Sequence, residues 1–235
     1  MGLLDGYKIR NAISKQQKGD VEGAKQAYEE LMAAGIYRPG FILPYSVLLL
    51  REGTPESYAK AKTILAKVQR SPELGADGRP QLLMNYAVAD WKLGNHEKAI
   101  ALLESSHREN VCGLTYQTLG FLYVEHGDVE KALAYNQEAL EYDDEDSVSL
   151  DNMGQLYYRL LNDKEKAKPY FDKAHEIKPS QIDTLWFLSR YDLEKGDTQA
   201  AIEKLETASE GRFSPLNYVD KEQVEAEIAR LKGNA

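Results

Sequence analysis

Few residues of this chain have the type and spacing that catalysis or metal binding requires. The four histidines, His96, His107, His126 and His175, are not spaced as zinc ligands with one another or with Cys112. Cys112 has no obvious basic neighbour to activate its thiol, so we expect a small packing residue. No phosphate-binding loop or nucleophile motif is present. The sequence therefore predicts a protein that is not an enzyme and that uses no metal or other cofactor.

The acidic run EYDDED at residues 141–146 is the nearest approach to a cation site. It lacks the alternating ligands and the glycine of a calcium loop. It also lies just before a predicted helix, where acidic side chains favour the helix N-terminus. We therefore expect it to have a structural role.

Composition narrows the possible partners and locations. The 235 residues include 29 basic and 38 acidic side chains, for a net charge of −9, and no basic stripe that would favour a nucleic acid. The longest apolar run, residues 41–50, is half of the roughly 20 residues that a membrane-spanning helix needs. Residues 1–10 lack an apolar signal core, and a single cysteine excludes an internal disulfide. These features predict a cytoplasmic protein, with an anchor removed ahead of Met1 as the open alternative.

A short break recurs along the chain at intervals of 33 to 41 residues. It is usually a glycine followed by a polar residue, as in Gly19-Asp20, Gly53-Thr54, Gly94-Asn95, Gly127-Asp128, Asn162-Asp163 and Gly196-Asp197. Glycine ends a helix in the left-handed conformation without steric cost, and the polar residue can cap the next helix. An alanine follows each break, at positions 24, 61, 99, 132, 167 and 201. Each unit therefore reads as two antiparallel helices that approach closely at the alanine.

This pattern resembles the tetratricopeptide repeat family over about residues 5–214. The unit at 113–146 carries the resemblance through Tyr116, Leu119, Gly120, Tyr123, Gly127, Ala132 and Ala139. The next unit carries it through Leu150, Met153, Gly154, Tyr157, Ala167, Phe171, Ala174 and Pro179. The resemblance implies an all-α fold, an α-solenoid of antiparallel helix pairs stacked into a right-handed superhelix.

The implied organisation is a single domain over residues 1–235. Its repeats lie at about 5–38, 39–79, 80–112, 113–146, 147–181 and 182–214. Residues 219–232 are expected to form a capping helix, because Asp220 and Gln223 make a capping box ahead of an apolar stripe of Val224, Ile228 and Leu231.

A second stripe of side chains lies about 120° from the core stripe on each first helix. By resemblance, it lines the concave groove in which the family binds peptides. The predicted groove residues are Ile13, Val47, Leu50, Met84, Val88, Trp91, Gln117, Phe121, Val124, Asp151, Gln155, Tyr158, Trp186 and Arg190. The alternative is that neighbouring helices partly bury these side chains.

The partner that this groove predicts is a protein: an amphipathic helix or an extended apolar peptide. The first helices lack the Lys and Asn pattern with which some family members clamp a carboxylate, and carry Ile9, Ile13, Leu43 and Val47 there. The expected function is a non-enzymatic scaffold for protein–protein interaction. The competing hypothesis is a structural protein that assembles into homo-oligomers through its apolar surface.

Overall fold

The computed structural model describes residues 3–233, which contain helices and no strands. It divides into two compact units, Met1–Glu109 and Asn110–Ala235, and each unit is described by itself. No helix in the described range is long and apolar enough to cross a membrane.

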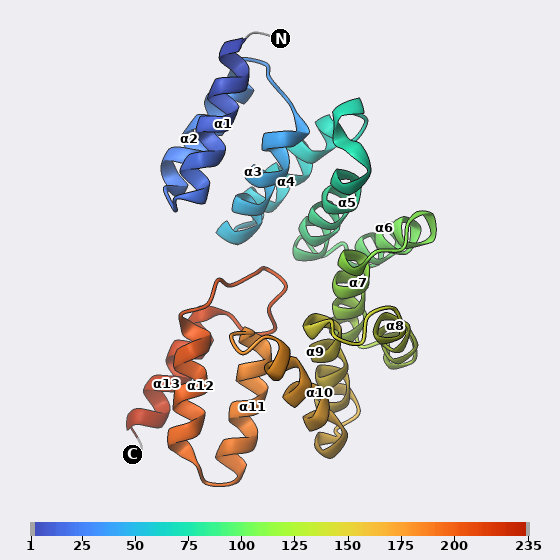
Figure 1. The fold of residues 1–235 in the computed structure, drawn as a ribbon, viewed down its shortest axis with the longest axis vertical. Helices are drawn as coiled ribbons and strands as arrows, with labels where there is room; N and C mark the ends of the chain where they lie inside the picture. The colour runs from blue at the N-terminus through green and yellow to red at the C-terminus, as the bar shows by residue number, and fades with distance from the viewer. Residues whose placement is uncertain (1–2, 234–235) are drawn as a thin grey trace. The chain divides into compact units, whose positions relative to one another are not determined.

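The first unit consists of three helix pairs joined by short turns (Figure 1). Its helices are α1 (Leu3–Gln17), α2 (Val21–Ala33), α3 (Pro39–Glu52), α4 (Pro55–Val68), the 3-10 turn η1 (Pro72–Leu74), α5 (Gly75–Lys92) and α6 (His96–Glu109). The main contacts run within each pair, and each following first helix packs on both helices of the pair before it, as α5 does on α3 and α4.

The second unit repeats this arrangement and adds a final helix (Figure 1). Its helices are α7 (Gly113–His126), α8 (Val129–Tyr142), α9 (Ser147–Gln155), the π-helical turn η2 (Leu156–Leu160), α10 (Lys164–Ile177), α11 (Ile182–Glu194), α12 (Thr198–Ser209) and α13 (Lys221–Gly233). Helix α13 packs on α12.

The turns within the pairs have the predicted geometry. Glycine takes a positive φ at five of the six breaks, as at Gly127 with φ 81°, and Asn162 takes φ 50° at the sixth. The following residue caps the next helix: the Asp128 side chain accepts from the Lys131 N–H, and Thr54 forms a capping box with Ser57. The polar residue therefore satisfies amides that the helix itself leaves free.

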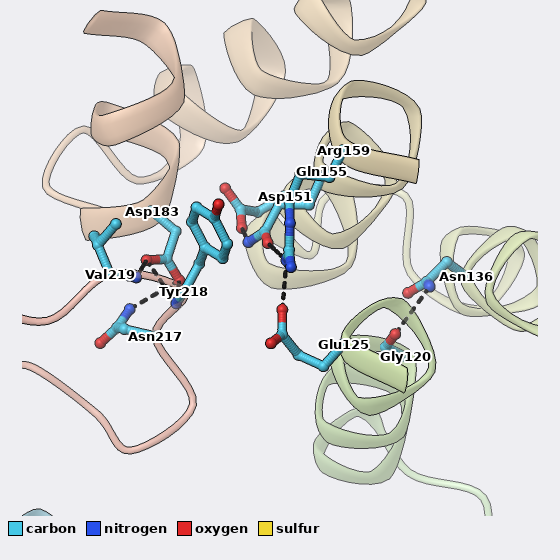
Figure 2. Close-up of polar contacts among 10 residues, drawn as sticks. All are labelled: Gly120, Glu125, Asn136, Asp151, Gln155, Arg159, Asp183, Asn217, Tyr218 and Val219. Atoms are coloured by element: carbon cyan, nitrogen blue, oxygen red, sulfur yellow. Dashed lines mark hydrogen bonds and ion pairs between the residues drawn. The ribbon is translucent and has the colours of Figure 1, made fainter. Parts of the chain in front are cut away.

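Each helix pair touches at its alanine. The alanines at 24, 61, 99, 132, 167 and 201 are all fully buried, and a large side chain four residues later is buried beside five of them. In the remaining pair this position is Asn136. It is fully buried, and its amide donates to the carbonyl oxygens of Ala132 and Gly120 (Figure 2). An asparagine fits here because Gly120 offers a carbonyl and no side chain.

The turn η2 interrupts the first helix of the fifth pair. The break residue follows the helix start by 15 positions here, from Ser147 to Asn162, and by 14 positions in the pair from Gly113 to Gly127. The Leu161 N–H donates to the Leu156 carbonyl, a five-residue spacing that absorbs the additional residue. Tyr158 and Arg159 lie in this turn.

Helix α13 covers the apolar side of α12. Val224 and Leu231 are buried in one cluster with Ala201, Leu205 and Ala208, and Ile228 packs against it. The backbone N–H groups of Asp220 and Gln223 are each accepted by the other's side chain, so the expected capping box forms. The three apolar residues therefore do share one face, as the sequence predicts.

Candidate functional site

The predicted groove residues separate into two groups by burial. Six of them have at most 6% of their surface exposed, namely Leu50, Val88, Phe121, Val124, Asp151 and Gln155. The other eight are half-buried, namely Ile13, Val47, Met84, Trp91, Gln117, Tyr158, Trp186 and Arg190. The second group contains the side chains that a ligand could reach without a rearrangement.

In the first unit, the half-buried members come from α1, α3 and α5. The Trp91 ring stacks on the His96 ring at a centroid distance of 4.1 Å. Trp91 thus packs against the first residue of the next helix, α6. Ile13, Val47 and Met84 make the rest of this surface apolar.

In the second unit, α9 and α11 place polar groups beneath the surface. The Asp151 carboxylate accepts from the Gln155 amide at 2.7 Å and from the Thr184 hydroxyl, and all three residues are buried. Arg159 of η2 donates to Gln155 at 2.9 Å and pairs with Glu125 (Figure 2). This network ties α9 to α11 directly and to α7 through η2.

Two buried carboxylates belong to this region. Burial raises the pKa of Asp151 from its ordinary value to about 6. Burial, followed by repulsion from the Asp151 carboxylate, raises the pKa of Asp183 to about 7. The two groups therefore disfavour being ionised together.

Next to this network lies an open pocket of about 490 Å³ that is lined by aromatic and arginine side chains. Its lining consists of Tyr158, Arg159, Leu160, Trp186, Phe187, Arg190 and Tyr218. The Arg190 guanidinium lies 4.2 Å from the Trp186 ring centre and pairs with Glu227 at 2.6 Å. We call this the aromatic pocket. It brings together Tyr158, Trp186 and Arg190 of the predicted set.

The sequence did not identify Arg159, Phe187 and Tyr218 as members of this pocket. Arg159 is brought there by the π-helical turn, and the 15-residue spacing was the signal for that turn. Tyr218 comes from residues 210–220, which join α12 to α13 and have no helical period. Nothing in the local pattern shows that this segment reaches α11.

No group of three or more His, Cys, Asp or Glu side chains that could hold a metal ion occurs among the described residues. The pocket lining instead combines aromatic rings with two guanidinium groups.

Comparisons with known proteins agree with the geometry. A family model of the tetratricopeptide repeat matches residues 149–181. No curated protein sequence matches the chain. Helix pairs with these turns and small contact residues define an α-helical repeat protein.

Solved structures extend that class to the rest of the chain. PilW, a type IV pilus biogenesis factor, is similar with a TM-score of 0.66 and 13% identity over 96% of this chain and 100% of its own. PilF of Pseudomonas aeruginosa has a TM-score of 0.60 and 16% identity, covering 95% and 97%. A tetratricopeptide repeat protein of Thermus thermophilus has a TM-score of 0.59 and 18% identity, covering 78% and 97%. The chain therefore has the fold of a tetratricopeptide repeat protein, and its described helices are consistent with about six repeats and a C-terminal helix. That fold suggests a scaffold for protein–protein interaction.

Proposed function

We propose that this protein is a non-enzymatic scaffold that binds a segment of a partner protein against the first helices of its repeats. The aromatic pocket of the second unit is the principal contact. The observation that carries this proposal is the pocket's lining, because half-buried aromatic rings beside guanidinium groups are the side chains that dominate protein interfaces.

The form of the partner follows from the surface. Trp186 and Tyr158 offer apolar faces, and the guanidinium groups of Arg159 and Arg190 lie against rings. Arg159 uses Nη1 for its bonds to Glu125 and Gln155, which leaves its Nε and Nη2 as hydrogen-bond donors for a ligand. An extended peptide presents both apolar side chains and main-chain carbonyl groups to such a surface. In the first unit, Ile13, Val47, Met84 and Trp91 would add an apolar contact suited to an amphipathic helix.

A displayed random-peptide library, selected on the full chain, tests the proposal. Peptides recovered from it are measured by calorimetry against the wild type and Trp186→Ala. We expect Trp186→Ala to weaken binding at least tenfold, because a buried tryptophan anchor contributes about 2 kcal/mol or more. Tyr142→Ala is the matched control, since Tyr142 is 56% exposed and lies outside the pocket.

Circular dichroism establishes that both variants are folded before they are compared. Equal binding by the wild type and Trp186→Ala would show that the aromatic pocket is not the site. Failure to select any peptide from an extended-peptide library would contradict the proposed function for this surface.

A further inference from the structure

Residues 210–220, here called the strap, already place a short segment of this chain against α11. The Tyr218 N–H donates to both carboxylate oxygens of Asp183 at 3.1 Å, and the Val219 N–H donates at 3.4 Å. The Asn217 amide donates to the same carboxylate at 3.0 Å (Figure 2). One buried side chain thus accepts from two consecutive main-chain amides and from one side-chain amide.

The Tyr218 ring has two partners from outside the strap. It stacks on Phe187 at a centroid distance of 5.2 Å, and the Arg159 guanidinium lies 3.9 Å from its centre on a different element. Asp183, Phe187 and Arg159 therefore form a slot that takes an asparagine followed by an aromatic residue. We call it the Asp183 slot.

The contacts of the slot are those by which a protein recognises an extended peptide. Main-chain amides provide the bonds that any sequence could make, and the asparagine amide and the ring provide selectivity. Asp183 is only 5% exposed, so its carboxylate needs such donors whichever segment supplies them.

Between its anchors the strap is held by a turn of its own, in which the Ser214 N–H donates to the Asn217 side-chain oxygen at 2.7 Å and the Asn217 N–H donates to the Ser214 carbonyl. Phe213 and Val219 pack into the α12–α13 core, but Ser214 through Asn217 are exposed or half-buried. Asn217 and Tyr218 bond to α11 rather than to a helix of their own, and Tyr218 keeps 39% of its surface exposed. This exposed edge of Tyr218 is also a wall of the aromatic pocket, so the slot and the open pocket are continuous.

We propose that the Asp183 slot is a binding site for an extended partner segment with an asparagine–aromatic pair, and that Asn217 and Tyr218 fill it in cis. The partner must displace this pair before it can bind. This inference rests on the proposed function and adds the chemistry of the partner and a means of regulating access.

The probe is a synthetic peptide of residues 213–220, FSPLNYVD, labelled for fluorescence polarisation. The open-slot variant is Asn217→Ala with Tyr218→Pro, which removes the ring, the side-chain amide and one main-chain N–H but keeps Val219 in the core. If the strap is open in about 1–10% of wild-type molecules, its removal should tighten peptide binding about 10- to 100-fold. The control is the same peptide with alanine in place of the asparagine and the tyrosine, and it should bind the open-slot variant no more tightly than the wild type.

Asp183→Asn in the open-slot variant locates the site. It should remove most of the gain, because an amide cannot accept the same set of N–H groups that a carboxylate accepts. A folded open-slot variant that binds the peptide no better than the wild type would overturn the inference and leave the strap as a structural tie. If the strap peptide does not bind but the library peptides still require Trp186, the proposed function remains supported and only the Asp183 slot is excluded.

If the open-slot variant does not fold, hydrogen exchange in the wild type replaces it. Excess peptide should accelerate exchange of the Tyr218 N–H, since displacement frees that amide, and unchanged exchange would overturn the inference. A wild-type dimer that the open-slot variant cannot form would mean that the occupant is the strap of a second copy, which would also overturn it.

Discussion

Gly154→Ala is expected to destabilise the fifth repeat because α9 and α10 meet at this glycine. A Cβ atom at position 154 would lie 2.6, 2.7 and 2.8 Å from three ring carbons of Phe171. Phe171 is fully buried, stacks on Phe187 at 4.9 Å and meets Tyr158 edge-on at 6.4 Å. The ring therefore cannot turn away without disturbing two further rings.

The magnitude follows from two opposing effects. Overpacking a close-packed core costs about 1–3 kcal/mol. Replacing glycine by alanine inside a helix returns up to about 1 kcal/mol. We therefore expect a net loss of up to about 2 kcal/mol.

Native-state hydrogen exchange of the α9 and α10 amides measures this loss directly. Gly6→Ala is the matched control, because a Cβ there meets no atom within 4 Å and should only gain from helix propensity. Phe171→Leu should cost less in Gly154→Ala than in the wild type, since it relieves the same contact. A Gly154→Ala protein as stable as Gly6→Ala would refute the close approach of these helices.

Three further outcomes are expected. Leu119→Ala should lower the free energy of unfolding by about 2–5 kcal/mol, because Leu119 is 1% exposed, and a loss below about 0.5 kcal/mol in urea titration would contradict its core position. The pKa of Asp183 is raised to about 7, so the folded chain keeps a proton that the unfolded chain releases above about pH 4, and the free energy of unfolding falls as the pH rises. Asp183→Asn should make the fall in the free energy of unfolding between about pH 5 and about pH 8 shallower, and equal slopes in the two proteins would contradict this. Val224→Asp should remove the hydrogen-exchange protection of α12 but not that of α7, because it places a charge against Leu205 and Ala208. Glu222→Asp, at an exposed position, should change neither, and intact protection of α12 in Val224→Asp would contradict the packing of α13 on α12.

The repeat architecture could be predicted because local chemistry determines it. A left-handed turn needs glycine, as at Gly127, or an asparagine, as at Asn162, and a close helix crossing needs a small residue such as Ala132. Both signals recur at a fixed period. The sequence alone therefore predicts where the helices lie in the chain and which residues make the contacts within each pair.

The candidate site could be predicted only in part because its other residues come from distant segments. Asp183 is bonded by residues 34 to 36 positions further along, in a strap with no period to place it. The burial of Phe121 and Val124 depends on how neighbouring helices pack, which one helix's stripe does not reveal. Arg159 reaches the aromatic pocket because the π-helical turn η2 changes the helical periodicity after α9, which a regular helical pattern does not predict.

The packing of each helix on its near neighbours in sequence also determines how this protein folds and unfolds. In each unit the main contacts join a helix to the next one or to the one after it. Such a topology has low contact order, which favours rapid folding that nucleates in any pair and spreads along the chain. Heat should then melt the chain in segments, so that a single transition temperature averages over repeats of unequal strength. A destabilising substitution in one repeat should affect the neighbouring repeats most and distant repeats least. One repeat can then open locally while the others stay folded.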